Sequence, residues 1–367
     1  MSVAFRLIVA RVVPSSSIIL AVGVKVRGCP DKPGDTNPCD AVEIRCRNVN
    51  MPLDPHVKRL LDMLAAGKND ISRLSPQAMR QAVEKLAQLV DAKNVPVGSI
   101  DNREIPGPVC GLPVRIYTPL LNEAGSLPAL IYFHGGTGVF CSIETHDGLC
   151  RLLANESGCR VISVGYRLAP EHKFPSAVED SCAAAKWVFA HSEELGIDPE
   201  RIAVGGDSAG ATLATVVCQL AKQMDGPEFA LQVLICPVTD LGSDSASRRS
   251  FSEGYFFDMA MLDWALGHYL TADADLTDAR LSPLRAADLR ALPPAHVHTA
   301  ELDPFRDEGE AYADALKRAQ VPVTYTCHKG LIHHFYCMAG AIPHSRVAIT
   351  GIGSSVRAAL FYATRSA

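Results

Sequence analysis

The stretch Arg201-Ile-Ala-Val-Gly-Gly-Asp-Ser-Ala-Gly-Ala-Thr212 determines how the rest of the sequence is interpreted. Its first five residues form a short apolar run typical of a buried strand, and the residues from Ala211 to Lys222 follow a helical pattern. Between them, Gly206-Asp-Ser-Ala-Gly210 has G-x-S-x-G spacing. A sharp strand-to-helix turn needs small neighbours and presents the serine at a helix N-terminus, where the dipole favours negative charge. We interpret Ser208 as a nucleophile; the alternative is a glycine-rich turn with a solvent-facing serine.

Outward from this turn, short β-rich runs alternate with helix-length segments from about residue 98 onward. The expected strands are Val114–Tyr117, Ala129–Phe133, Val161–Val164, Ile202–Gly205, Leu231–Ile235, His296–Thr299 and Val323–Thr326. The expected helices are 147–155, 178–194, 208–223, 306–319 and 345–363. Several strands are continuous apolar runs, which predicts one α/β domain with a mostly parallel sheet covered on both faces.

A nucleophilic serine needs a histidine as base, and the base needs an acid that orients it. Asp303 directly follows the sixth expected strand. We favour it over Asp307, which suits the first turn of the next helix, and over Glu301, which lies too close to the strand end. His333 and His334 both follow the last strand. Adjacent side chains point in different directions, so only one can be the base, and chain order alone does not choose between them.

A glycine-rich loop, His134-Gly-Gly-Thr-Gly138, follows the second expected strand. Glycines let backbone amides approach a developing oxyanion without interference from a Cβ atom. The amides of Gly135 and Gly136, together with that of Ala209, are therefore candidates for an oxyanion hole. A phosphate-binding loop is the alternative, but neither G-x-G-x-x-G nor a P-loop Lys-Ser/Thr pair is present.

Composition narrows the class of protein. The chain has 367 residues, 48% of them hydrophobic, and a formal charge of −5, so it can bury a large core and lacks the basic surface that nucleic-acid binding needs. No apolar run is long enough to span a membrane. Twelve cysteines occur without a single C-x-x-C pair. Reduced thiols in a cytoplasmic protein are a better interpretation than disulfides or a metal framework, and we expect no bound metal.

Four sequence blocks occur in an order that resembles the hormone-sensitive-lipase-like branch (bacterial family IV) of the α/β-hydrolase esterases. The blocks are Tyr132–Gly136, Tyr166–His172 with Phe174–Asp180, Gly206–Gly210, and Asp303–Asp307 with Ile332–Phe335. The resemblance covers roughly residues 51–365. It implies an α/β-hydrolase fold, with a mostly parallel central sheet of about eight strands flanked by helices and a helical cap.

The resemblance also implies roles for individual residues. It matches Ile332-His333 to the family's Ile-His pair, which makes His333 the base and leaves His334 where the family usually has glycine. Thr137 likewise replaces a third glycine of the loop. The implied catalytic residues are Ser208, Asp303 and His333, and the implied oxyanion donors are Gly135, Gly136 and Ala209. The implied reaction is hydrolysis of short- to medium-chain carboxylic esters through an acyl-enzyme, without a cofactor.

Domain boundaries follow from composition and the resemblance together. Residues 1–50 carry seven Lys or Arg against four Asp or Glu and one aromatic residue, so we expect an atypical extension that contributes little to the core. The expected order is then N-terminal cap helices over 51–95, hydrolase core over 96–240, a second cap segment over 241–275, and core over 276–367. Three aromatic residues of the second cap segment are candidates for the substrate pocket: Tyr255, Phe256 and Trp264.

Two other functions stay open on the sequence. An amidase or formamidase would use the same three catalytic residues, and a non-catalytic ligand-binding relative would keep the fold alone. We expect a small-molecule ester as substrate, and the resemblance also allows a homodimer formed through the last strand.

Overall fold

A computed structural model describes residues 53–65, 74–120, 125–224 and 226–362 of the chain. Every described residue lies within the unit Asn50–Ala367. The extension expected over residues 1–50 lies outside the described residues.

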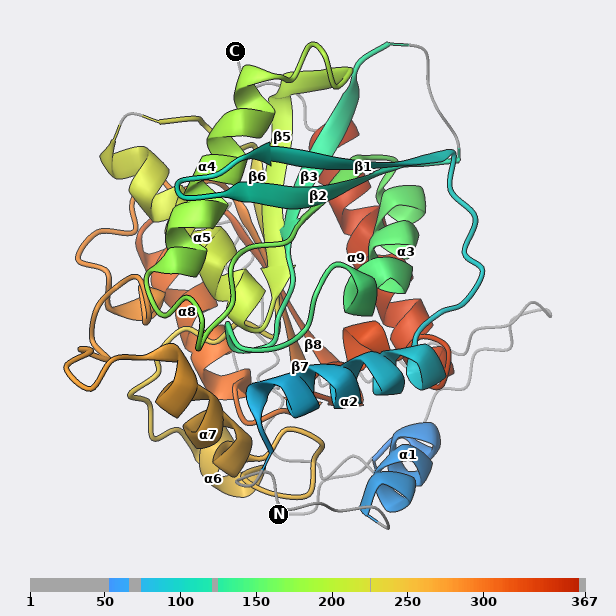
Figure 1. Ribbon diagram of the computed structural model, residues 1–367, viewed down its shortest axis with the longest axis vertical. Helices are drawn as coiled ribbons and strands as arrows, with labels where there is room; N and C mark the ends of the chain where they lie inside the picture. The colour runs from blue at the N-terminus through green and yellow to red at the C-terminus, as the bar shows by residue number, and fades with distance from the viewer. Residues whose placement is uncertain (1–52, 66–73, 121–124, 225, 363–367) are drawn as a thin grey trace, which may run out of the picture. The chain divides into compact units, whose positions relative to one another are not determined.

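The central feature is a single sheet of eight strands in the order β1-β2-β4-β3-β5-β6-β7-β8 (Figure 1). The six strands from β4 to β8 in this order are parallel, whereas β1 and β2 add an antiparallel edge. The strands are β1 (Ser99–Pro106), β2 (Gly111–Thr118), β3 (Leu127–Phe133), β4 (Arg160–Val164), β5 (Ile197–Asp207), β6 (Leu231–Ile235), β7 (Ala295–Leu302) and β8 (Val323–Ile332). The predicted mostly parallel, eight-stranded sheet is confirmed.

Helices cover both faces of this sheet, as Figure 1 shows. On one face, α4, α5 and α8 bury their apolar residues against the strands, and on the other face α3 packs against α9. The helices are α1 (Pro55–Ala65), α2 (Pro76–Val90), α3 (Asp147–Ser157), α4 (Ser176–Ala190), α5 (Ala209–Gln223), α6 (Ala246–Ser250), α7 (Met259–Tyr269), α8 (Arg306–Arg318) and α9 (Pro343–Phe361). Burial on both faces explains why β3 is buried at all seven of its positions.

The strand that the sequence pattern did not predict is β1. Its sequence, SIDNREIP, has one buried residue, Ile105, because β1 is the outer strand of the antiparallel edge. All the predicted strands except β6 are also longer than expected. Since β7 continues to Leu302, Glu301 lies within the strand, and its carboxylate accepts hydrogen bonds from the Lys329 ammonium and the Gly330 amide.

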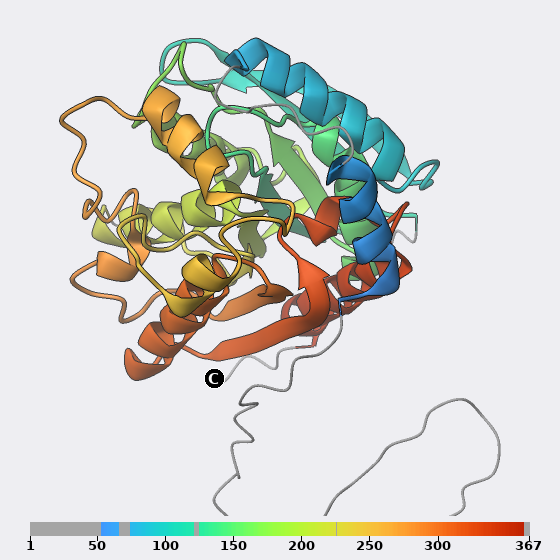
Figure 2. The same ribbon diagram turned by 90° about the horizontal axis from the view of Figure 1, so that it is seen from below.

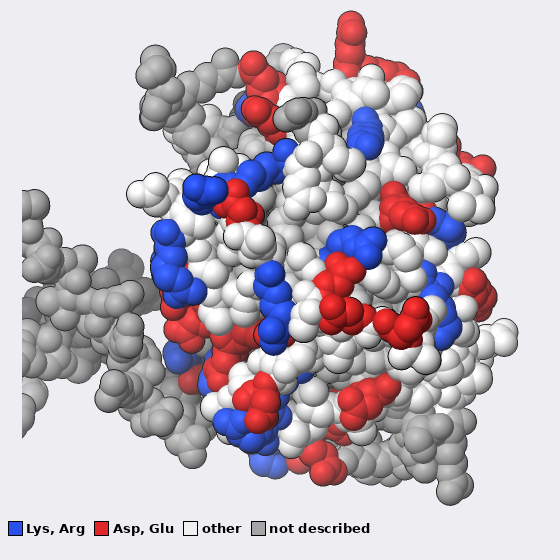
Figure 3. Space-filling view, turned by 90° about the vertical axis from the view of Figure 1, so that its left-hand side faces the viewer, with Lys and Arg blue, Asp and Glu red and all other residues white. Residues whose placement is uncertain are grey.

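The charged surface and the cysteines of the described residues fit what the composition predicted, a chain without a basic surface and with reduced thiols. On the face shown in Figure 3, basic and acidic side chains are interspersed, and no broad basic patch is visible on that face. The nine cysteines of the described residues are all free, and six of them are buried. Among the described residues, no helix is long and apolar enough to cross a membrane.

The excursion between β6 and β7 is fixed to the core by one buried ion pair. Arg248 of α6 is 2.7 Å from the carboxylate of Glu308 on α8, and their side chains are only 7% and 1% exposed. The same guanidinium donates hydrogen bonds to the carbonyl oxygens of Asp240, Leu241 and Ser243. A single side chain thus connects the start of the excursion to the helix that follows β7.

We predict that Arg248→Ala lowers the free energy of unfolding by about 3–5 kcal/mol, because it leaves the Glu308 carboxylate buried without its cationic partner. The matched control is Arg249→Ala on the same helix. Arg249 pairs with Asp244 at the surface, where the side chains are 60% and 84% exposed, and such a pair contributes about 0–1 kcal/mol. Urea denaturation of both variants measures the difference; equal destabilisation by both would contradict the role given to Arg248.

Candidate active site

The serine of the G-x-S-x-G motif lies in the tight turn between β5 and α5. Ser208 has φ 52° and ψ −121°, a strained conformation for a residue with a side chain, and its amide donates to the carbonyl of Ile235. The flanking glycines are required by close packing. A Cβ atom on Gly206 or Gly210 would lie 2.4 or 2.0 Å from the carbonyl oxygen of Phe133. The motif therefore lets β3 approach the turn and holds the Ser208 hydroxyl at the edge of the sheet.

The two other predicted catalytic residues follow the neighbouring parallel strands. Asp303 comes directly after β7 and His333 directly after β8. His333 Nδ1 lies 2.8 Å from Asp303 Oδ2, and His333 Nε2 lies 3.1 Å from Ser208 Oγ. The other carboxylate oxygen of Asp303 accepts from the Phe305 amide at 2.8 Å. An ionised carboxylate only accepts, so Nδ1 donates to it and Nε2 is left to accept the serine proton.

His334, the second candidate base, points elsewhere. Its ring stacks on Phe256 with centroids 5.5 Å apart and meets the ring of His146 edge-on at 6.1 Å. Burial, with a smaller effect of the neighbouring His146, lowers the pKa of His334 to about 3. Such a weakly basic imidazole is poorly matched to proton transfer near neutral pH. The geometry therefore pairs His333, and not His334, with the serine.

The thiol of Cys236 lies close to Asp303. Burial raises the pKa of this thiol well above its usual value, and the charge of the Asp303 carboxylate raises it further. Among the described residues, Cys236, Asp303 and His333 form one group whose sulfur, oxygen and nitrogen atoms lie within 4.8 Å of one another. Thiolate and imidazole groups are ligands that zinc and softer metal ions prefer. In this structure Asp303 Oδ2 and His333 Nδ1 are joined directly by the 2.8 Å hydrogen bond.

The glycine-rich loop lies directly against the serine. A Cβ atom on Gly135 would be 2.3 Å from the Asp207 carboxylate and 3.2 Å from the Cβ of Ser208, and Gly136 has φ +101°. The amides of Gly135 and Gly136 donate to no other described residue. The amide of Ala209 belongs to the first turn of α5, where helices leave N–H groups without intrahelical partners. Gly135 and Ala209 thus adjoin the serine, and Gly136 lines the same cavity as Ser208.

Neighbouring aromatic and polar groups fix this loop. The Tyr166 hydroxyl donates to the carbonyl of His134 at 2.6 Å, and the two rings stack with centroids 4.4 Å apart. Thr137, which stands where the family usually has glycine, has φ 55°, and its hydroxyl donates to the carbonyl of Gly136 at 2.7 Å. The threonine therefore adopts the left-handed backbone of a glycine and adds a hydrogen bond within the loop.

A cavity of about 250 Å³ opens onto the serine and the histidine. Its wall combines residues of α1 and α2, the glycine-rich loop, and the segment before and within α7. The residues that line it are Leu64, Met79, Ala82, Val83, Leu86, Gly136, Phe140, Cys141, Ser208, Phe256, Phe257, Met261, His333, His334 and Tyr336. None of these described residues is a Lys, Arg, Asp or Glu, so the cavity is suited to neutral, apolar groups.

Of the three aromatic residues predicted to line the pocket, Phe256 does so, whereas Tyr255 and Trp264 are not among the lining residues. Tyr255 packs edge-on against Phe251 with centroids 5.0 Å apart. The Trp264 indole donates to the carbonyl of Leu74, and its ring lies behind Phe140 at 6.5 Å. Neighbouring packing turns these two side chains away from the cavity.

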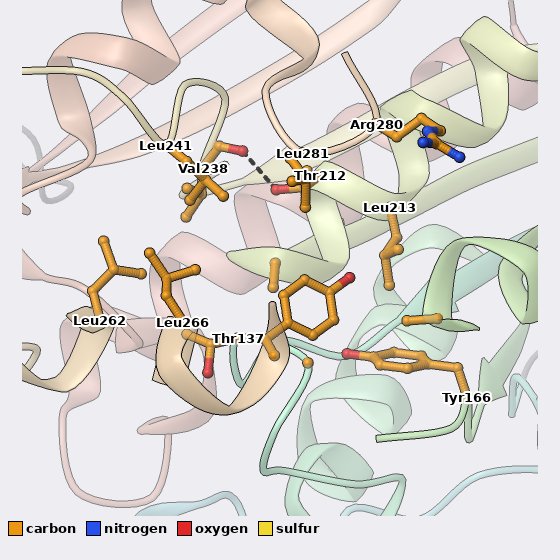
Figure 4. A pocket seen from close by; sticks show the side chains of 14 residues that line it. Thr137, Tyr166, Thr212, Leu213, Val238, Leu241, Leu262, Leu266, Arg280 and Leu281 are labelled. Atoms are coloured by element: carbon orange, nitrogen blue, oxygen red, sulfur yellow. Dashed lines mark hydrogen bonds between the residues drawn. The ribbon is translucent and has the colours of Figure 1, made fainter. Parts of the chain in front are cut away.

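A second, smaller pocket of about 50 Å³ borders the same glycine-rich loop (Figure 4). It is lined by Thr137, Gly138 and Ala209 on the side of the catalytic residues. Aliphatic side chains make up most of the remainder, among them Val238, Leu241, Leu262, Leu266 and Leu281. The Thr212 hydroxyl in this wall is satisfied by the carbonyl of Val238 at 2.6 Å. This pocket is therefore narrow and apolar.

Sequence reasoning selected three candidate catalytic residues that the structure brings together, but it missed most of the cavity wall. Met79, Val83 and Leu86 were recognised as one face of a helix, and the structure shows that this face lines the cavity. Phe257 and Met261 lie in the aromatic segment that was singled out, yet they were not chosen. Helical periodicity identifies such a face, but it does not tell whether the face meets the core or an open space.

Comparison with known proteins agrees with this fold. The family model for the α/β hydrolase fold matches residues 130–337, and the chain belongs to that family. Within it, the chain falls in the hormone-sensitive-lipase-like branch, as the four sequence blocks predicted.

Several relatives are named as esterases or ester hydrolases. The chain is 43% identical to the carboxylic ester hydrolase LipN of Mycobacterium tuberculosis over 242 residues, which are 64% of each chain. It is 39% identical to an arylesterase of Saccharolobus solfataricus, covering 78% of this chain and 92% of the relative. An esterase of the archaeon Pyrobaculum calidifontis has a solved structure that superposes with a TM-score of 0.81 at 40% identity. The match covers 84% of this chain and 99% of that chain. The names of these relatives confirm the predicted enzyme class, carboxylic ester hydrolase.

We predict that His333→Ala abolishes turnover whereas His334→Gly keeps most of it. Only His333 contacts the serine, and His334 has φ 68°, a conformation that glycine adopts without strain. Steady-state ester hydrolysis by both folded variants tests this. The reverse pattern of losses would assign the base to His334.

Proposed function

We propose that this protein is a serine carboxylesterase that hydrolyses short- to medium-chain esters through an acyl-enzyme intermediate. The observation that carries the proposal is the continuous line of hydrogen bonds from Asp303 through His333 to the Ser208 hydroxyl, which ends at the apolar cavity. Nucleophile, base and orienting acid within hydrogen-bond distance are the geometric signature of this chemistry.

In the proposed first step, His333 Nε2 takes the proton of Ser208 as Oγ attacks the ester carbonyl. Asp303 keeps the imidazole in the required tautomer and stabilises the imidazolium that forms. The amides of Gly135, Gly136 and Ala209 donate to the oxyanion of the tetrahedral intermediate. His333 then protonates the departing alcohol, and a water molecule repeats the sequence on the acyl-enzyme.

The substrate class follows from the cavity. Its volume of about 250 Å³ is slightly below the roughly 300–1,000 Å³ of pockets for drug-sized ligands. Apolar walls without charged side chains favour neutral esters with small acyl and alcohol groups. The names of two relatives fit this size, an arylesterase of Saccharolobus solfataricus and an ethyl acetate hydrolase of Pseudomonas putida, the latter 37% identical over 303 residues.

The proposed cap consists of the helices within residues 51–95 and the segment 241–275. Leu64 of α1, Met79 of α2 and Met261 of α7 all line the cavity that contains Ser208, so both segments contribute to its wall. Figure 2 shows α1 and α2 from below, where they are drawn in blue. A cap built in this way limits access of water to the ester and limits the length of the chains that fit.

We predict that Ser208→Ala leaves a folded protein whose ester hydrolysis falls by several orders of magnitude, on the order of 10⁴-fold or more. Hydrolysis of p-nitrophenyl butyrate and labelling with a fluorophosphonate measure the loss. Wild-type protein should be labelled at Ser208 and the variant should not. Activity within about tenfold of wild type would contradict the assignment of the nucleophile, since a catalytic serine contributes far more.

A series of p-nitrophenyl esters should show a preference for short acyl chains, about two to eight carbons, because the cavity is finite and apolar. The measurement is kcat/KM for each ester below its solubility limit. Faster cleavage of the sixteen-carbon ester than of the four-carbon ester would refute the proposed substrate class. Faster cleavage of matched p-nitroanilides than of the esters would favour an amidase.

A further inference from the structure

A second pair of a histidine and a carboxylate lies behind the glycine-rich loop. Asp207, the residue before Ser208, is completely buried, as is His146 of the short 3-10 helix η2 (Glu144–His146). His146 Nε2 lies 3.1 and 3.2 Å from the two oxygens of the Asp207 carboxylate. The Tyr132 hydroxyl on β3 donates to the same carboxylate at 2.6 Å. The proposed mechanism does not use any of these three side chains.

This carboxylate is in close contact with the loop that carries the proposed oxyanion donors. The space that a Cβ atom of Gly135 would occupy lies 2.3 Å from Asp207 Oδ2 and 3.2 Å from the Cβ of Ser208. The Asp207 carboxylate and the Cβ of Ser208 therefore both pack closely around Gly135. Because the carboxylate packs against Gly135, a shift of Asp207 would also displace the Gly135 amide relative to the nucleophile.

An ionised carboxylate at this position has an electrostatic cost. Negative charge develops on the substrate oxygen in front of the loop, and like charges repel strongly in a buried site. A cation paired with Asp207 would cancel this repulsion and leave the mechanical support intact. His146 is the group placed to supply that cation.

We propose, on the basis of the proposed esterase function, that His146 is a positioning residue whose protonated imidazole neutralises Asp207, so that Asp207 supports the oxyanion loop without repelling the oxyanion. Two independent observations support it, the double contact of His146 with the carboxylate and the close contact of that carboxylate with Gly135.

The other titratable groups around this pair leave His146 as its cation. Burial, together with the neighbouring His146, lowers the pKa of His134 to about 4 and that of His334 to about 3, so both rings are neutral near pH 7. Burial raises the pKa of Asp91 to about 6. Burial opposes the charged form of His146, but the Asp207 carboxylate outweighs it, so the pKa of His146 is raised. Burial likewise opposes the charged form of Asp207, but His146 outweighs it, so the pKa of Asp207 is lowered.

The decisive experiment compares His146→Gln with the double variant His146→Gln/Asp207→Asn. In the single variant an uncompensated carboxylate remains beside the oxyanion, so we expect kcat to fall by about tenfold to a hundredfold with KM nearly unchanged, because the effect is on the transition state. Removal of the charge in the double variant should restore a measurable part of kcat. A merely structural role for His146 predicts the opposite, that a second substitution lowers kcat further.

Two results would overturn the role proposed for His146. One is a kcat of His146→Gln within about twofold of wild type, and the other is a double variant that is slower than the single variant. Should His146→Gln fail to fold, Asp207→Asn alone carries the test. Neither partner is then charged, so we expect a kcat within about tenfold of wild type, and a loss above about a hundredfold in folded protein would refute the proposal. His191→Gln, on a histidine that stacks on Trp187 at the end of α4, is the matched control.

Fluorophosphonate labelling of the wild-type protein distinguishes the two proposals. Absence of labelling and of ester hydrolysis in the wild type would overturn the proposed function. Normal labelling of the wild type, combined with a normal kcat for His146→Gln, would overturn only the role of His146.

Discussion

The close approach of three backbone segments at the start of α5 is the constraint on which the site depends. Gly206 and Gly210 leave room for the carbonyl of Phe133, and Gly135 leaves room for Asp207. A Cβ atom at any of these glycines would lie closer than 2.5 Å to a neighbouring atom, so β3 and its loop would have to move away from the turn. The glycines therefore set the distance between the nucleophile and the loop that is proposed to bind the oxyanion. Side-chain chemistry then acts within a geometry that the backbone has already fixed.

Parallel strand order explains how residues far apart in the chain meet at this turn. The carboxyl ends of β5, β7 and β8 lie at the same edge of the sheet, because these strands run in one direction. Ser208, Asp303 and His333 each follow one of these ends directly. The short strand β6 lies between β5 and β7 and contributes Cys236, whose thiol lies beside Asp303. Each proposed catalytic residue is thus positioned by the end of a buried strand.

Sequence reasoning predicted the features that depend on local chemistry and missed those that depend on tertiary direction. Glycine spacing and chain order selected Ser208 and Asp303 as candidates, and family resemblance was needed to prefer His333 over His334. The polar strand β1 escaped notice because an edge strand need not be apolar. Tyr255 and Trp264 were plausible pocket residues by composition, yet each is held by a neighbour outside the cavity. Asp207 lay inside the quoted motif, but only coordinates reveal its contact with His146.

Backbone strain is concentrated around the same site. Thr137, Ser208, Cys236 and His334 all have positive φ, between 46° and 68°, and they follow β3, β5, β6 and β8 respectively. Each such residue costs about 1–3 kcal/mol relative to a relaxed backbone, and such conformations persist only where the surroundings dictate them. The two departures from the family pattern, Thr137 and His334, belong to this set and adopt the left-handed backbone that favours glycine. Their side chains add contacts that a glycine lacks, a hydroxyl bond to Gly136 and a stack on Phe256. The strain is therefore offset locally, which accounts for how the chain departs from its family at two loop positions without displacing the catalytic groups.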